Sequence, residues 1–319
     1  MNWKKRILAI LILGGVKIGL FHIINRIIYH LALSGNELKE PSESCYFEWR
    51  FGRIFYEKKG RGKPILLIHD LSATSSSFEW TRITDTLSLT NTVYAVDLLG
   101  CGRSDKPNLT YTSFLYVQLI SDFIKNVISS KVDVIATGES GVFTLAAASY
   151  EGKLINRIML VNPRDFFSLA KAPTKWTKSL RFIINTPIVG TFLYNTLINP
   201  CTIRRKFRTT YFYRAEQVTK EMVTTYFMAS QLDKTRSKYL CSSLLSRYTN
   251  ANIIHNLKNI TNSVFILAGS GDPKNRIIAD QYNHYLPSIE VIDLDNTKML
   301  PQLETPEEFL EQVRILFEL

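Results

Sequence analysis

From Tyr46 onward, short apolar runs alternate with longer segments whose apolar residues recur at helical spacing. This order of elements predicts an α/β fold, in which a mostly parallel, twisted sheet is flanked by helices. Continuous apolar runs favour strands that are buried on both faces. The expected strands are 51–59, 65–69, 93–97, 132–137, 157–162, 263–268 and 290–294. The expected helices between them lie near 76–87, 113–128, 142–150, 277–285 and 307–317.

One connection is too long for this pattern. About a hundred residues separate the expected strands that end at Asn162 and begin at Ser263, whereas the connection between a strand and a helix usually has about two to six. Its apolar residues again recur at helical spacing, which predicts a helical cap inserted at about 164–250. We therefore expect an α/β domain over 46–319 that carries the cap, preceded by a separate segment over 1–34.

Residues 1–34 have the composition of a membrane anchor. Basic residues at positions 4–6 precede the apolar run 7–16, and a mixed run continues to Leu33. No small-x-small cleavage site follows the apolar run, which favours an uncleaved anchor over a secretory signal. Lys17 would lie near the middle of a span, so a helix lying in the membrane interface is the alternative. If the segment spans, the basic cluster favours an N-terminus on the inner side.

The formal net charge of +11 is unevenly distributed. Residues 1–31 hold five basic residues and no acidic residue, and residues 164–214 hold ten basic residues and one acidic residue. The second segment is also rich in aromatic residues, a mixture that suits an anionic membrane surface. A solvated basic face over a helical core explains it equally well. No nucleic-acid-binding module accompanies the charge, so no nucleic-acid partner is expected.

The composition excludes several classes of protein. With 45% hydrophobic and 21% charged residues, the chain is neither disordered nor collagen-like. The four cysteines lie far apart without a C-x-x-C pair, so neither a zinc site nor a redox motif is predicted. We expect no metal and no cofactor, and the sequence makes no prediction of the oligomeric state.

Polar motifs follow several expected strands, at the edge where open α/β sheets bind ligands. Ser140 lies in G-E-S-G-V, after the strand 132–137 and before a helix. Such a strand–turn–helix pattern holds a nucleophilic serine exposed at the top of a sheet. Asp272, in A-G-S-G-D-P, follows the strand 263–268, and D-L-L-G-C-G-R-S-D-K-P follows the strand 93–97.

With these motifs the chain resembles the α/β-hydrolases of the single-domain, helical-capped type from about Tyr46 to its end. The D-L-L-G-x-G-x-S-D-K-P motif is the most specific match. The resemblance implies a hydrolase of esters or acyl compounds, with Ser140 as nucleophile and Asp272 as acid. It also implies an oxyanion hole made by the backbone N–H groups of Leu71 and Gly141, which would stabilise the charge that develops on the carbonyl oxygen.

The same resemblance places Met299 where these enzymes have the catalytic histidine. A thioether cannot accept the serine proton at neutral pH, and residues 285–319 contain no histidine. We therefore predict a degenerate site that is impaired in turnover and binds an apolar or lipid-like ligand, whose contact residues the sequence does not predict. The alternative is an active serine hydrolase that uses an unidentified base.

Two further residues depart from the family pattern. Asp70 replaces a glycine in the expected oxyanion loop, where a carboxylate would oppose a forming oxyanion, and Val142 replaces a small residue after the serine. Two alternatives stay open for the other roles. Asp165 is a second candidate for the acid, and Lys298 is a candidate for the base.

Overall fold

The computed structural model describes residues 3–34 and 44–318. Residues 1–2 of the expected anchor and residue 319 of the expected domain lie outside the described residues. Eight strands form one sheet in the order β1-β2-β4-β3-β5-β6-β7-β8. Their bounds are β1 (Ser44–Trp49), β2 (Gly52–Lys59), β3 (Lys63–Ile68), β4 (Asn91–Val96), β5 (Val132–Thr137), β6 (Ile155–Val161), β7 (Ser263–Gly269) and β8 (Glu290–Leu294).

The sheet is mostly parallel, as the sequence predicts. β1 pairs antiparallel with β2 and β2 pairs antiparallel with β4, whereas the remaining neighbours pair in parallel. β1 is not among the expected strands. It forms because Gly52, with a φ of +142°, reverses the chain so tightly that Trp49 pairs directly with Gly52.

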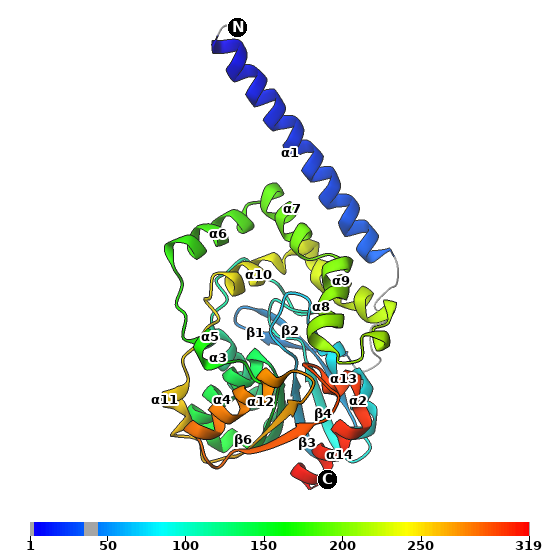
Figure 1. Cartoon of the computed structure of the whole chain (residues 1–319), viewed down its shortest axis with the longest axis vertical. Helices are drawn as coiled ribbons and strands as arrows, with labels where there is room; N and C mark the ends of the chain where they lie inside the picture. The colour runs from blue at the N-terminus through cyan, green and yellow to red at the C-terminus, as the bar shows by residue number, and fades with distance from the viewer. Residues whose placement is uncertain (1–2, 35–43, 319) are drawn as a thin grey trace.

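Helices cover both faces of the sheet (Figure 1). Those of the α/β domain are η1 (Ser77–Trp80), α2 (Thr81–Leu87), α3 (Ser113–Phe123), η2 (Ile124–Ile128), α4 (Glu139–Glu151), η3 (Gly152–Leu154), α12 (Pro273–Tyr285), α13 (Pro301–Glu304) and α14 (Pro306–Phe317). One buried cluster packs the sheet against α3, α4 and α12, and a second packs the opposite face against α2 and α14. Alternate residues of β3 and β5 enter the two clusters, as the period of a strand requires.

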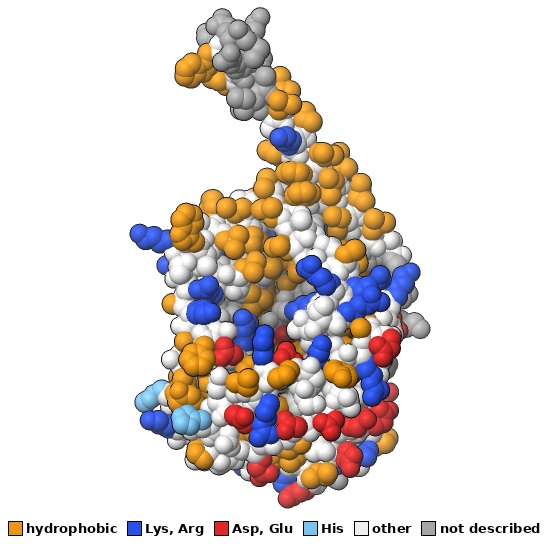
Figure 2. Space-filling model, viewed as in Figure 1, with side chains coloured by type: hydrophobic (Ala, Val, Ile, Leu, Met, Phe, Trp, Pro, Cys, Tyr) orange, Lys and Arg blue, Asp and Glu red, His pale blue; other side chains and the backbone are white. Residues whose placement is uncertain are grey.

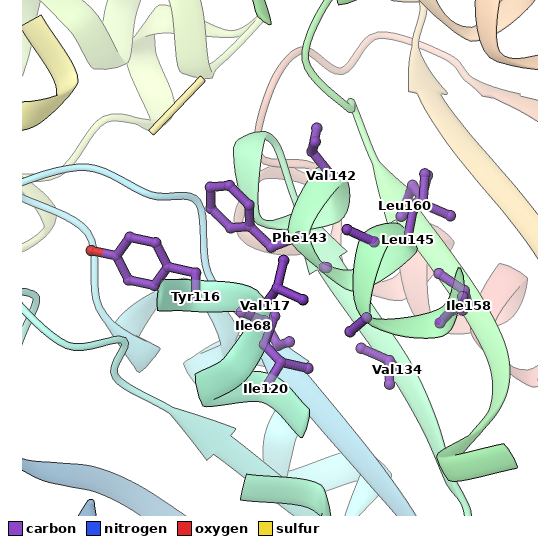
Figure 3. Packing of buried hydrophobic residues seen from close by; sticks show 14 of the residues in the cluster. Ile68, Tyr116, Val117, Ile120, Val134, Val142, Phe143, Leu145, Ile158 and Leu160 are labelled. Carbon is purple, nitrogen blue, oxygen red and sulfur yellow. The ribbon is translucent and has the colours of Figure 1, made fainter. Parts of the chain in front are cut away.

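Helix α4 approaches the sheet closely at Gly141. A β-carbon at Gly141 would lie 3.1 Å from Cδ2 of Leu160 on β6, which is tighter than a normal contact. Val142 is fully buried, and Figure 3 shows it within the cluster that also holds Phe143 and Leu160. The close approach of helix and strand is made by Gly141, one residue before the position at which the family pattern has its small residue. Val142 therefore fits this core.

The long connection between β6 and β7 forms the expected helical cap (Figure 1). Its helices are α5 (Phe166–Leu169), α6 (Lys175–Asn185), α7 (Ile188–Leu197), α8 (Pro200–Lys206), η4 (Phe207–Tyr211), η5 (Ala215–Gln217), α9 (Lys220–Thr235), α10 (Lys238–Leu245) and α11 (Ile254–Leu257). Helix α1 (Trp3–Leu33) packs beside α7 and α9 and then projects beyond the cap, at the end of the molecule opposite α14 (Figure 1).

Candidate active site

The turn from β5 to α4 is centred on Gly138. Its backbone has a φ of +58° and a ψ of −123°, a conformation that glycine adopts freely and other residues adopt only under strain. In an α/β-hydrolase the nucleophile sits on such a strained turn between strand and helix. The residue in that place is here a glycine, so the turn carries no side chain that could act as a nucleophile.

Ser140, the expected nucleophile, lies two residues further on, in the first turn of α4. Its side chain is fully buried, and its hydroxyl donates a hydrogen bond to the carbonyl oxygen of His69 (2.6 Å). The expectation that Ser140 is exposed at the top of the sheet is therefore wrong. The hydroxyl instead ties the start of α4 to the segment that follows β3.

The oxyanion hole also differs from the expectation. The N–H of Gly141 donates to the carbonyl oxygen of Gly138 (3.3 Å), inside the first turn of α4. The N–H directly after the turn belongs to Glu139, and it donates to Oδ1 of Asp70 (3.0 Å). Because the N–H after the nucleophile is the one that holds the oxyanion in this fold, the Asp70 carboxylate occupies the oxyanion position. Leu71, the other expected donor, lies in the same loop with its side chain buried.

A side chain on the turn would have no room. A β-carbon at Gly138 would overlap the carboxylate of Asp70, lying 2.7 Å from its Cγ, and would lie 2.8 Å from Cε of Met299. The family resemblance places Met299 where these enzymes have the catalytic histidine. In the structure, the methyl group of Met299 lies next to the turn. Asp70 and Met299 together fill the space in which a nucleophile and its base would meet.

The loop that carries Met299 is fixed by Asn162, at the end of β6. Nδ2 of Asn162 donates to the carbonyl oxygen of Lys298 (2.7 Å), and its Oδ1 accepts from the N–H of Gly269 on β7 (2.9 Å). Lys298, the alternative base, donates from Nζ to the carbonyl oxygen of Thr209 in the cap (3.2 Å). These bonds join the ends of β6 and β7, the loop after β8 and the cap into one structure.

Both candidate acids cap helices. Oδ1 of Asp272 accepts from the N–H of Lys274 (3.1 Å) at the start of α12. Asp165 accepts from the N–H groups of Phe167 and Ser168 (3.0 Å each) at the start of α5. Such caps satisfy backbone donors that a helix leaves free. The positions of both carboxylates therefore have a structural explanation.

Outside α1, the histidines are His69, His255 and His284. Nε2 of the fully buried His69 accepts from the N–H of Leu98 (3.0 Å), so the ring proton lies on Nδ1, which is 2.7 Å from the carbonyl oxygen of Asp70. Burial lowers the pKa of His69 and keeps the ring neutral. His255 and His284 are exposed, on α11 and α12. Within residues 3–34 and 44–318, no group of three or more His, Cys, Asp or Glu side chains could hold a metal ion.

A buried carboxyl group that sequence reasoning missed lies beside Asp70. Oε2 of Glu79 accepts from the N–H of Asp70 (3.0 Å), and its Oε1 accepts from the hydroxyl of Tyr226 (3.2 Å). Burial, and secondly the charge of Asp70, raises the pKa of Glu79 to about 8. At neutral pH Glu79 is therefore mostly protonated. Nothing in the surrounding S-F-E-W marks this residue, because its role depends on contacts with distant segments.

A pocket of about 350 Å³ lies between the loop after β3 and the cap. Its lining includes Tyr226, the partner of Glu79, and two cations, Arg205 and Lys206, that are exposed to solvent. Nζ of Lys206 lies 4.6 Å from the ring centroid of Tyr211. Hydroxyl groups and aliphatic side chains complete the wall, among them Ser72, Thr74, Leu197, Ile203 and Thr210.

Comparison with known proteins shows the family. The family model described as Alpha/beta hydrolase family matches residues 65–312. A relative from Metapseudomonas resinovorans, 2-hydroxy-6-oxo-6-(2'-aminophenyl)hexa-2,4-dienoic acid hydrolase, is 31% identical over 132 residues, which cover 39% of this chain and 45% of the relative. The match thus spans less than half of that relative's length.

Two solved structures show the same fold at lower identity. The epoxide hydrolase CorEH is 17% identical, with a TM-score of 0.70 over 86% of this chain and 98% of that chain. Naproxen esterase from Bacillus subtilis is also 17% identical, with a TM-score of 0.61 over 92% of this chain and 97% of that chain. From the family match, the sheet order and the cap, the chain belongs to the α/β-hydrolase family.

Proposed function

We propose that this chain is a non-hydrolysing member of the α/β-hydrolase family, which is held at a membrane by α1 and binds an amphiphilic ligand beneath its cap. One observation carries the loss of turnover: the strained turn after β5 holds Gly138, and the carboxylate of Asp70 accepts from the N–H of Glu139 beside it. The ligand and the membrane are argued below from the pocket and from α1.

Hydrolysis on this fold needs a nucleophile, a base and free oxyanion donors. Gly138 has no side chain, and Met299 has no nitrogen that could accept a proton. The N–H of Glu139 is already bonded to a carboxylate, whose charge would repel a forming oxyanion. Three requirements fail together, so replacing the histidine alone would not restore the chemistry.

A fluorophosphonate probe tests this directly. We expect the purified chain to remain unlabelled, because the hydroxyl of Ser140 is buried and donates to a backbone carbonyl. Intact-mass spectrometry after incubation with the probe measures the labelling. Labelling that disappears in Ser140→Ala would support the alternative of an active serine hydrolase and contradict the proposal.

The lining of the pocket supports the proposal that the ligand is amphiphilic. Apolar and hydroxyl-bearing side chains line about 350 Å³, and Arg205 and Lys206 provide positive charge at its wall. This chemistry fits an amphiphile with an anionic head and an apolar chain. The relative from Metapseudomonas resinovorans is named for the hydrolysis of a dienoic acid, which is also anionic. A site for an anionic ligand that has lost its chemistry is consistent with both facts.

Replacing Lys206 by alanine should weaken the binding of a fluorescent fatty acid by about tenfold or more, because a hydrogen bond to a charged group contributes about 1.5–3 kcal/mol. Fluorescence titration of the detergent-solubilised chain measures the affinity. Lys131→Ala is the matched control, since Lys131 is exposed and lines a different depression. If Lys206→Ala and Lys131→Ala bind the fatty acid with equal affinity, this pocket is not the ligand site.

The length and composition of α1 support the proposal that this helix anchors the chain in a membrane. Within the described part of the chain, it is the helix that is long and apolar enough to cross a membrane, over Ile12–Leu33, with a mean hydropathy of 1.3. Only 6% of that window is buried in the structure. An exposed apolar helix of this length is costly in water, at about 25 cal/mol for each Å² of apolar surface.

Deleting residues 2–20 should turn the chain from an integral into a peripheral membrane protein while leaving the cap covered, because the residues of α1 that pack on the cap lie between Phe21 and Leu33. After fractionation of expressing cells, the full chain should resist extraction by high salt and by alkaline carbonate. The shortened chain should be extracted by high salt. If high salt also extracts the full chain, α1 is not an integral anchor.

A further inference from the structure

The second half of α1 is part of the folded body. The ring of Phe21 stacks on Phe192 of α7, with centroids 4.1 Å apart, and Nδ2 of Asn25 donates to the carbonyl oxygen of Ile188 (3.0 Å). Asn195 of α7 donates in turn to Oδ1 of Asn25 (3.0 Å). The residues shielded by the cap recur every three or four positions, at Phe21, Ile24, Asn25, Ile28, Tyr29 and Ala32. This stripe fixes the direction of α1 relative to α7.

The first half of α1 therefore leaves the body at a defined point. Because residues 21–33 of the apolar stretch Ile12–Leu33 pack on the cap, the part of α1 that is free to cross a membrane is residues 3–20. At 1.5 Å per residue, residues 3–20 extend about 27 Å beyond Phe21, close to the roughly 30 Å of a bilayer's hydrocarbon core. If this projection crosses the membrane, the near surface of the membrane lies at the level of α7. Lys17, four residues before Phe21, is then only about 6 Å from that surface, where its ammonium group can reach water.

At this level the cap presents apolar side chains outward. On α6, Trp176 is 86% exposed and Phe182 is 75% exposed. On α7, Val189, Leu193 and Leu197 are also exposed. Figure 2 shows the hydrophobic surface of α1 continuing onto this end of the body. A contiguous apolar surface of this kind marks an interaction site rather than a face of a free soluble domain.

Charge identifies the kind of partner. Helix α6 interleaves the exposed Lys175 and Lys178 with its apolar residues, and α8 adds the exposed Arg204 and Arg205. Figure 2 shows basic side chains below the hydrophobic end and acidic side chains gathered toward the opposite end. Basic residues beside exposed Trp and Phe are the pattern of a helix that lies in an anionic membrane interface.

We propose that α6 and α7 lie in the boundary between headgroups and acyl chains of an anionic bilayer, around the base of α1. The inference rests on the proposed anchor and adds a second, independent membrane contact. In this position the exposed end of α7 at Leu197, which also lines the pocket under the cap, meets the lipid. An amphiphile could then pass from the bilayer to the pocket without entering water.

Trp176 is a built-in reporter for this contact. The chain has four tryptophans, and Trp49 and Trp80 are buried at 7% and 0% exposure. In the full-length Trp3→Phe variant, a change in fluorescence on reconstitution therefore reports Trp176. We expect its emission to shift to the blue in vesicles of phosphatidylcholine and phosphatidylserine. Brominated acyl chains should quench it, and aqueous iodide should not.

The charge requirement is tested by Lys175→Gln and Lys178→Gln combined in the Trp3→Phe chain, because both lysines are exposed on α6. We expect the quenching by brominated phosphatidylserine vesicles to fall to the level seen with phosphatidylcholine alone. Trp3→Phe with Trp176→Phe gives the background from the two buried tryptophans. Iodide quenching of Trp176 in vesicles, with no effect of brominated lipid, would overturn the docking of α6.

Alkaline carbonate extraction of the same vesicles separates this proposal from the anchor. If the chain stays in the vesicles while Trp176 is open to iodide, the anchor holds and the docking of α6 is wrong. If carbonate removes the chain, the anchor itself is wrong. A second copy of the chain covering α6 would shield Trp176 from both quenchers until the ratio of lipid to protein is raised, and that outcome also overturns the proposal.

Discussion

Esterase activity should appear in this chain when Asp70→Gly, Gly138→Ser and Met299→His are made together. The first change frees the N–H of Glu139, the second places a hydroxyl on the strained turn, and the third supplies an imidazole. Asp272 already follows β7, where the family has its acid. We expect the hydrolysis of p-nitrophenyl acetate to rise about 10³-fold or more, because one oxyanion donor alone contributes about 10²–10³ and the triad contributes more.

Each single substitution should leave the rate at the wild-type background. Met299→His alone has no nucleophile to activate, and Gly138→Ser alone keeps the carboxylate of Asp70 against the new side chain. Ser140→Ala in the triple variant is the control and should retain the activity. If that control abolishes the activity, or if a folded triple variant stays inactive, these three residues do not account for the loss of turnover.

The fold could be predicted because it depends on periodicity. Apolar strands, helical spacing and one long connection predict the sheet and the cap, and the structure confirms them. β1 was missed because it is a short edge strand whose existence depends on the turn at Gly52. Edge strands are exposed on one side, so their sequences carry a weaker apolar signal than central strands.

The site could have been predicted better at one residue. The expected strand 132–137 ends where β5 ends, at Thr137, so the residue on the turn is Gly138. The sequence predicts Ser140 as the nucleophile because G-E-S-G matches a motif of glycines around a serine. Gly138 has the backbone conformation of the turn and Gly141 makes the close contact with Leu160. Counting from the end of the strand is therefore a stronger constraint than the letters of the motif.

Other features of the site could not be predicted from sequence. The replacement of a glycine by Asp70 was visible, but whether its carboxylate faced solvent or the turn depends on the placement of α4. The burial of Glu79 depends on Tyr226, which is contributed by the cap. The contact of α1 with α7 likewise joins segments more than 150 residues apart, at Asn25 and Ile188 (a separation of 163). Pattern along the chain carries little information about such pairs.

Gly138→Ala should be among the most destabilising single substitutions in the α/β domain, at about 4 kcal/mol. A non-glycine residue held at a φ of +58° and a ψ of −123° costs about 1–3 kcal/mol in backbone strain. The new β-carbon also overlaps the carboxylate of Asp70 and approaches Cε of Met299, so one of these side chains must move out of a packed site. Urea unfolding in detergent micelles, followed by circular dichroism, measures the change.

A double-mutant cycle separates the two causes. Asp70→Gly removes the overlap with the carboxylate but leaves the backbone strain and the approach to Met299, so the Gly138→Ala and Asp70→Gly double variant should recover about 1–2 kcal/mol relative to the sum of the single changes. Gly152→Ala is the matched control, because Gly152 has a φ of −56° and its β-carbon would meet only the amide oxygen of Asn262, at 3.2 Å. We expect that control to change stability by less than about 1 kcal/mol. Strict additivity of Asp70→Gly and Gly138→Ala would mean that the carboxylate does not occupy the turn, and the explanation of lost turnover would then fail at its first step.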